Sequence, residues 1–124
     1  MNALRAARTL TTHVLDTARG RPAGGVRIDL SRVEPDGRRR HIKTVTTNAD
    51  GRADAPLLGE GEMAVGCYEL VFHVGDYFRA AGLPLADPPY LDVVPVRFAI
   101  AEPEAHYHVP LLVSPWSYAT YRGS

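Results

Sequence analysis

Three histidines and one arginine are the residues of this chain whose types and surroundings could do chemistry. His106 and His108 lie two positions apart in an apolar segment, so in a strand both side chains would project from one face. His13 lies in a second, β-branched segment, and Arg52 follows an Asp-Gly turn. A neutral imidazole can activate water, and a guanidinium can stabilise the charge that develops on an attacked carbonyl. These residues predict a hydrolytic site made by His13, Arg52 and His108, provided that the fold brings them together.

The same segments allow two other kinds of site. His13, His106 and His108 could supply three imidazoles to a zinc ion, but two of them would have to reach it from one strand, without an acidic partner nearby. The serines of the C-terminal segment could act as nucleophiles, but none lies in a Gly-x-Ser-x-Gly sequence. We therefore expect neither a metal nor a cofactor, although spacing alone does not select the site. His41 and His73 are interpreted as structural and His106 as peripheral.

Alternation of apolar and polar residues predicts the strands that must position these side chains. They are expected at 10–17, 26–31, 41–48, 67–74, 91–100, 106–113 and 116–122. Gly75 is expected to end one strand, and Asp76 and Gly82 to cap a short helix over residues 76–82. Seven or eight short strands between turns are typical of an all-β, antiparallel two-sheet β-sandwich. We predict one domain, residues 9–124, after a poorly ordered N-terminal extension of residues 1–8.

The first and penultimate strands each carry a second face with polar residues. If both strands lie in one sheet with Val14 and Val109 inward, His13 and His108 emerge on the same outer surface. That surface would also carry apolar residues of the penultimate strand, such as Leu112, so it suits a partly buried cleft better than open water. We therefore expect a subunit interface there.

Composition excludes several classes of function. Fourteen basic residues balance fourteen acidic ones, which gives no electrostatic reason to bind nucleic acid or an anionic membrane. The basic run Arg38–His41 is typical of a solvated hairpin tip. No apolar stretch approaches the ~20 residues that cross a bilayer, and the first residues lack a signal-peptide core. Cys67 is the single cysteine, so no intrachain disulfide is possible, and we expect a cytoplasmic protein.

Three segments resemble the 5-hydroxyisourate hydrolase family, transthyretin-related enzymes of purine catabolism. They are Thr12-His-Val-Leu-Asp-Thr-Ala-Arg-Gly-Arg-Pro-Ala23, Thr47-Asn-Ala-Asp-Gly-Arg52 and the tail from His106-Tyr-His-Val-Pro-Leu-Leu to Tyr-Arg-Gly-Ser124. The resemblance covers roughly residues 9–124, and the ending is highly specific. Ala119 departs from the serine that is more usual there.

The resemblance implies a transthyretin-like (prealbumin-like) sandwich that forms a homotetramer, a dimer of dimers, with active sites at the subunit interface. It implies hydrolysis of 5-hydroxyisourate to 2-oxo-4-hydroxy-4-carboxy-5-ureidoimidazoline in urate degradation. The implied catalytic residues are His13, Arg52, His108 and Ser124. The implied substrate-binding residues are Pro110, Tyr121, Arg122 and Gly123. The alternative is a transthyretin-like carrier of a small apolar ligand, which would have lysine, glutamate and threonine in place of His13, Arg52 and His108.

Overall fold

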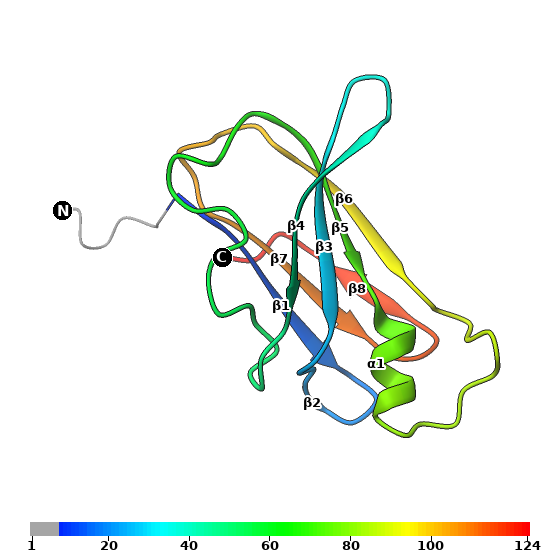
Figure 1. The fold of residues 1–124 in the computed structure, drawn as a ribbon. Helices are drawn as coiled ribbons and strands as arrows, with labels where there is room; N and C mark the ends of the chain where they lie inside the picture. Colours follow the sequence, from blue (N-terminus) through cyan, green and yellow to red (C-terminus); the bar gives the residue numbers. More distant parts are fainter. Residues whose placement is uncertain (1–7) are drawn as a thin grey trace.

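The computed structural model describes residues 8–124, which form two facing four-stranded sheets (Figure 1). One sheet has the order β2 (Arg21–Pro22), β1 (Leu10–Asp16), β7 (Tyr107–Val113), β8 (Tyr118–Thr120). The other has the order β4 (Arg39–Thr46), β3 (Arg27–Val33), β5 (Gly66–Phe72), β6 (Val94–Ile100). Within the described range, α1 (Val74–Ala80) is the one helix. The predicted β-sandwich is confirmed. Residues 1–7 of the predicted N-terminal extension lie outside the described residues.

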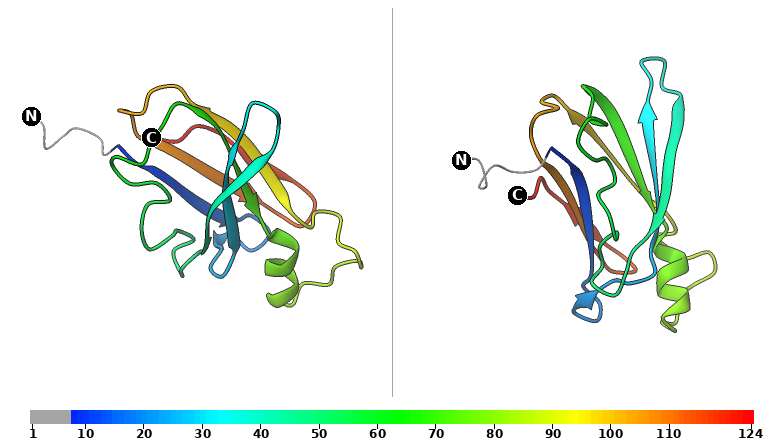
Figure 2. Two further views of the ribbon diagram at one scale, coloured as in Figure 1. Left: turned by 45° about the horizontal axis from the view of Figure 1, so that its top comes forward. Right: turned by 60° about the vertical axis from the view of Figure 1, so that its left-hand side comes forward.

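The core lies between the sheets, where the apolar faces meet (Figure 2). Every second residue of β1 is buried, from Leu10 through Val14 to Asp16, as expected for a strand with one face inward. Aliphatic and aromatic side chains of both sheets fill the layer. Its largest fully buried members include Leu10, Val14, Ile28, Leu30, Leu70, Phe72, Ile100 and Leu111. Polar residues between the buried ones are thereby turned to the outer surfaces.

One strand pairing differs from the predicted antiparallel arrangement. β1 and β7 are parallel, whereas the five other strand pairs are antiparallel. A hairpin forces consecutive strands to be antiparallel, but the chain passes through the whole second sheet between β1 and β7. The returning strand can therefore have either direction. The short strand β2 was not predicted, because its Arg-Pro sequence lies in a segment rich in turn residues.

The predicted boundaries of the helix are wrong. α1 begins at Val74, after His73 as N-cap, so Asp76 lies in the first turn and makes no capping hydrogen bond. Gly75 lies inside the helix and does not end the strand. Its N–H donates to the carbonyl of Asp92 at 2.8 Å, and a Cβ at Gly75 would lie 2.6 Å from Asp92 Oδ1. This close contact with the 84–93 loop fixes the start of α1. Helix-capping preferences, which depend on the local sequence, do not predict it.

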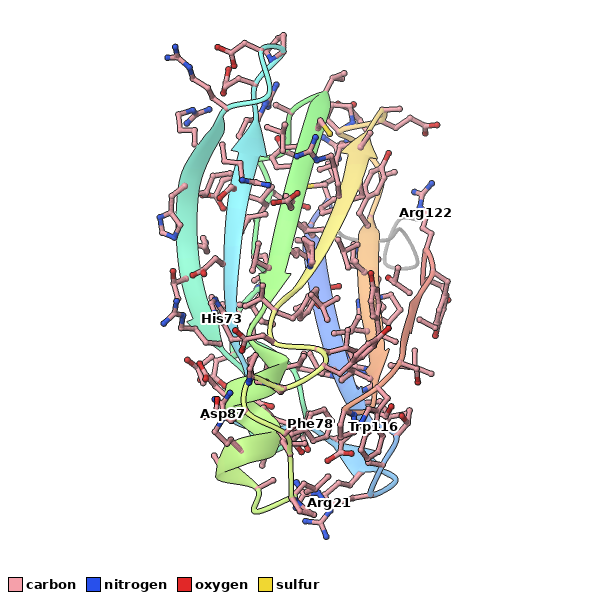
Figure 3. All side chains as sticks on the ribbon, turned by 90° about the vertical axis from the view of Figure 1, so that its right-hand side faces the viewer. Arg21, His73, Phe78, Asp87, Trp116 and Arg122 are labelled. Atoms are coloured by element: carbon pink, nitrogen blue, oxygen red, sulfur yellow. The ribbon has the colours of Figure 1, made fainter. Side chains whose placement is uncertain are left out.

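A buried polar cluster joins α1 to the end of β1. The Asp16 carboxylate is fully buried and accepts hydrogen bonds from the main-chain N–H and Nε of Arg19, both at 2.9 Å, and from the Tyr77 hydroxyl at 2.7 Å. Burial raises the pKa of Asp16, but the hydrogen bonds from Arg19 and Tyr77 outweigh it and hold that pKa below its usual value. Phe78, beside Tyr77, is buried against the sandwich (Figure 3).

The basic run at residues 38–41 lies partly in a strand. In the turn before it, the N–H of Glu34 donates to the Arg38 carbonyl and the N–H of Gly37 donates to the Glu34 carbonyl, and β4 already begins at Arg39. Arg39 and Arg97 both form ion pairs with the buried Glu69 of β5. These charges therefore hold strands of one sheet together. No helix in residues 8–124 is long and apolar enough to cross a membrane.

Candidate active site

The parallel register of β1 and β7 brings the two predicted catalytic histidines together. His13 is paired with Pro110, and Thr11 is paired with His108. Val14 and Val109 are buried between the sheets, so the side chains of His13 and His108 lie on the outer face. The ring centroids are 6.4 Å apart and the rings are inclined by 26°. The predicted common outer surface is therefore present, although the two strands run in the same direction.

The loop that ends at Arg52 is attached to the same stretch of β1. The side chain of Asn48 accepts hydrogen bonds from the main-chain N–H groups of Asp50 and Arg52, which folds the loop into a tight turn. Gly51 has φ of +75°, and its carbonyl accepts the N–H of Val14 at 2.8 Å. A side chain at Gly51 would also collide with the Val14 carbonyl. This contact places Arg52 opposite His13 in an isolated antiparallel bridge.

Burial and positive charge act together on the two histidines. Burial lowers the pKa of His13, and the Arg52 guanidinium lowers it further. Burial also lowers the pKa of His108, followed by Arg52, with His13 and His106 acting in the same direction. Both effects disfavour the imidazolium. The imidazoles are therefore neutral at neutral pH, which is the form that can accept a proton from water.

The C-terminal tail packs against His108. The N–H of Gly123 donates to the His108 carbonyl at 2.8 Å, and a Cβ at Gly123 would lie 2.5 Å from Cδ2 of the His108 ring. Only glycine allows this approach, and the exposed Ser124 directly follows it in the sequence. The Arg122 guanidinium instead lies 4.2 Å from the centroid of the Tyr107 ring and does not pack on the imidazoles.

Tyr121 is 61% exposed and Pro110 is buried beneath the outer surface. Arg122 and Trp116 mark opposite ends of the hairpin that β7 and β8 form (Figure 3). Thus Gly123, His13 and His108 are brought together with the Arg52 loop. The Arg122 guanidinium packs on Tyr107, and Tyr121 borders a hollow that His108 also lines.

The sequence reasoning missed two threonines, one beside His108 of β7 and one beside His106, which directly precedes β7. Thr11 Oγ1 lies 2.8 Å from Nδ1 of His108, and Thr9 Oγ1 lies 3.0 Å from Nδ1 of His106. Thr11 lies two residues before His13, so strand periodicity alone places both side chains on the same face of β1. The contact with His108 depends on the register between strands 97 positions apart, and the sequence pattern carries no signal for that register.

The remaining histidines lie outside this group or at its margin. His106 stacks on His108 at 6.4 Å between centroids. The Nε2–H of His73, directly after β5, donates to the Asp29 carboxylate at 2.8 Å, and Nε2 of His41 lies 2.9 Å from the Thr44 hydroxyl in β4. Among residues 8–124, no group of three or more histidine, cysteine, aspartate or glutamate side chains is arranged to hold a metal ion. Ser114 and Ser117 bond to each other in the β7–β8 turn.

Two hollows flank the histidines. A cavity of about 160 Å³ is bordered by Thr11, Arg52 and the 53–56 segment. A larger one, of about 340 Å³, lies between β6 and the β7–β8 hairpin and is bordered by Tyr107, His108 and Tyr121. The larger hollow is the open edge between the two sheets and contains neither His13 nor Arg52. The smaller hollow is bordered by Arg52 and the larger one by His108, so each touches one part of the candidate site.

Curated relatives match the chain over nearly its full length. A 5-hydroxyisourate hydrolase 2 of Rhizobium meliloti is 63% identical over 115 residues, which are 93% of this chain and 95% of that protein. A 5-hydroxyisourate hydrolase of Deinococcus radiodurans is 57% identical over the same shares of both chains.

Solved structures show the same fold. An (S)-allantoin synthase has a TM-score of 0.88 at 48% identity, covering 97% of this chain and 45% of that one, so this chain spans less than half of it. Sea bream transthyretin in complex with thyroxine has a TM-score of 0.81 at 33% identity, covering 93% of this chain and 94% of that one. A Klebsiella pneumoniae 5-hydroxyisourate hydrolase has a TM-score of 0.71 at 36% identity, covering 94% of this chain and 98% of that one. The model of the HIUase/Transthyretin family matches residues 10–123. The chain therefore belongs to the HIUase/Transthyretin family.

Proposed function

We propose that this protein hydrolyses 5-hydroxyisourate to 2-oxo-4-hydroxy-4-carboxy-5-ureidoimidazoline, with His13, Arg52, His108 and Ser124 as catalytic residues. The observation that carries the proposal is the pairing of His13 and His108 on one face of β1 and β7, with Arg52 bridged to His13. Burial and Arg52 lower the pKa of both imidazoles, which favours the neutral form that a base needs. The relatives at 57% and 63% identity bear the name of this hydrolase, which supports the same assignment.

The proposed reaction begins when one histidine takes a proton from water. The water oxygen then bonds to a ring carbonyl carbon of the substrate, and Arg52 stabilises the negative charge that develops on the carbonyl oxygen. The C–N bond of the six-membered ring breaks, the new carboxyl group stays on the product, and the ring nitrogen receives the proton. Because the guanidinium of Arg52 forms no ion pair within residues 8–124, its full charge is available to the substrate.

The C-terminal tail is proposed to complete the site. Gly123 already packs on His108, so the hydroxyl or terminal carboxylate of Ser124 can orient a histidine or the substrate. Pro110, paired with His13, would form the floor of the cleft. The proposed binding role of Arg122 needs a rearranged tail or a second subunit, because its guanidinium packs on the Tyr107 ring. Tyr121 already borders a hollow that His108 also lines.

We propose that the site lies at a subunit interface in a homotetramer. Large apolar side chains are exposed along the edge that carries the tail: Trp116 is 66% exposed, Tyr121 61% and Tyr118 46%. Such a surface is more typical of a buried interface than of a monomer. Sedimentation equilibrium measures the mass, and a monomer at micromolar concentration would contradict this part of the proposal. The free Cys67 fits a reducing, cytoplasmic setting.

Freshly generated 5-hydroxyisourate provides the test. Its ultraviolet absorbance decays spontaneously, and the protein should accelerate that decay, whereas a His108→Asn variant should not. A decay equal to that in buffer, from a protein with its folded circular-dichroism spectrum, would remove the hydrolase proposal. The rival function is binding, because the structural neighbour from sea bream is a transthyretin in complex with thyroxine. Titration with thyroxine tests it separately, and the charged histidine–arginine face predicts no saturable binding.

A further inference from the structure

We propose that Thr11 is a positioning residue that makes His108 the general base. Its hydroxyl accepts the N–H of His108 Nδ1, which leaves the lone pair of Nε2 free to take a proton from water. The inference deepens the proposed hydrolase function and rests on it. It also decides between the two histidines, since either one could serve as base by residue type alone.

The first support is geometric. Thr11 Oγ1 and His108 Nδ1 are 2.8 Å apart, and the two residues are directly paired across β1 and β7. Within residues 8–124 this is the one side-chain hydrogen bond of Thr11. Threonine is branched at Cβ, so its χ1 angle is restricted and the hydroxyl is held in place. The contact is therefore built by two strands of the sheet and does not depend on a loop.

The second support is that the His108 ring is contacted on two opposite edges. Gly123 packs against Cδ2 of His108, while Thr11 bonds to Nδ1 on the opposite edge of the ring. A half-turn of the ring would exchange Nδ1 and Cδ2, which would break the hydrogen bond to Thr11 and place a nitrogen against the tail. The two contacts fix one ring orientation and leave Nε2 on the side away from Thr11.

The choice of donor is part of the proposal. A hydroxyl can donate or accept, so the distance alone fits either tautomer. Burial and the charges of Arg52, His13 and His106 lower the pKa of His108, which favours the neutral ring with a single N–H. In the proposed arrangement that N–H is on Nδ1 and donates to the Thr11 hydroxyl, so Nε2 is the basic nitrogen.

His13 lacks such a partner. Its ring makes no hydrogen bond within residues 8–124, so no contact among these residues selects its tautomer. A base whose tautomer is not selected spends part of its time with the wrong nitrogen protonated. His13 is thereby left to contact the substrate, and His108 returns the proton to the leaving nitrogen.

The chain contains a matched control. Thr9 and His106 repeat the same threonine–histidine contact two residues earlier, directly before β1 and β7 begin, at 3.0 Å between Oγ1 and Nδ1. Thr9→Val removes the same hydroxyl next to the peripheral histidine, whereas Thr11→Val removes it next to the proposed base. Valine keeps the shape and the branched Cβ of threonine, so both variants retain the strand.

The experiment measures tautomer and kinetics on the full-length protein. Nitrogen-15 NMR of the substrate-free protein should show Nδ1–H for His108 in the wild type and a mixture of tautomers in Thr11→Val. In that variant kcat should fall about 10–100-fold with little change in KM, as is common for groups that orient a functional histidine. Thr11→Ser should restore most of the rate, and Thr9→Val should leave it unchanged.

Each of these measurements can overturn the proposed role of Thr11. An Nε2–H tautomer in the wild type, or an unchanged kcat in Thr11→Val, overturns the role of Thr11. An equal loss of kcat in Thr9→Val shows a general effect of the threonine ladder and also overturns it. If Thr11→Val does not fold, Thr11→Ser and the wild-type tautomer still decide. A wild type without hydrolase activity but with the Nδ1–H tautomer refutes the proposed function and leaves the hydrogen bond in place.

Discussion

Replacing Arg52 by glutamine separates the two roles that the structure gives this residue. Its guanidinium is a donor for the developing oxyanion, and its charge lowers the pKa values of His13 and His108 after the effect of burial. Arg52 is exposed, and its loop is closed by main-chain contacts with Asn48 that glutamine preserves. The variant should therefore fold normally while losing both functions.

The expected loss of rate follows from the number of donors removed. Loss of one donor to an oxyanion commonly costs ~2.7–4 kcal/mol, so kcat/KM of Arg52→Gln should fall about 10²–10³-fold. The pH profile should change as well. The base works only when neutral, and without the nearby positive charge the pKa of each histidine rises. The acidic limb of the profile should therefore move to higher pH.

Initial rates of 5-hydroxyisourate decay, measured across mildly acidic to mildly alkaline pH, test both expectations. Arg52→Lys keeps the charge but loses the planar pair of donors, so its rate should fall while its acidic limb stays in place. Arg38→Gln is a matched control, because the Arg38 side chain is 86% exposed in the β3–β4 turn of the other sheet. A wild-type rate in Arg52→Gln would refute the oxyanion role. A reduced rate with an unmoved acidic limb would refute the electrostatic coupling.

Three further perturbations test separate parts of the structure. Gly123→Ala places a Cβ 2.5 Å from the His108 ring and should reduce kcat about 10²-fold by displacing the ring or the tail. Steady-state kinetics measure this loss. As a control, Ala119→Ser on the neighbouring exposed strand should leave kcat unchanged. A C-terminal tag beyond Ser124 should inactivate the enzyme, whereas an N-terminal tag should not; equal activities of the two tagged proteins would contradict the role of the tail. Tyr77→Phe removes the hydroxyl that donates to Asp16 and should destabilise the fold by about 1.5–3 kcal/mol in urea unfolding at neutral pH. Because the folded-state pKa of Asp16 is lowered, the stabilisation by Asp16 is complete above about pH 4 and is lost as the pH falls through that folded-state pKa.

Local patterns in the sequence predicted most of the fold. The alternation in β1, β3, β5, β6 and β7 has the period of a half-buried strand, so these elements and the inward positions of Val14 and Val109 could be predicted. The start of α1 could not, because the carbonyl of Asp92, in a distant loop, binds the N–H of Gly75. Tertiary contacts of this kind override capping preferences.

Some features of the candidate site could likewise be predicted from the sequence, whereas others could not. Strand periodicity placed His13 and His108 on the outward faces of their strands, and their common surface followed only on the assumption that both strands lie in one sheet. The role of Thr11 depends on the register of β1 with β7 and on their parallel direction, which no local pattern contains. The position of Gly123 against His108 likewise depends on where the tail turns back. Residue types therefore indicated the chemistry, whereas pairing between distant strands determined which atoms meet.

The pairing of β1 with β7 also has a consequence for biosynthesis. β1 is translated 97 residues before its neighbour, which takes roughly 5–20 s at ordinary rates of translation. During that time the long edge of a β-branched strand has no partner, and such edges invite association between nascent chains. Contacts between such distant residues also slow folding. The histidine pair can form only after β7 has left the ribosome, so in a translation reaction the appearance of hydrolase activity should lag behind the appearance of β1 and report the completion of folding.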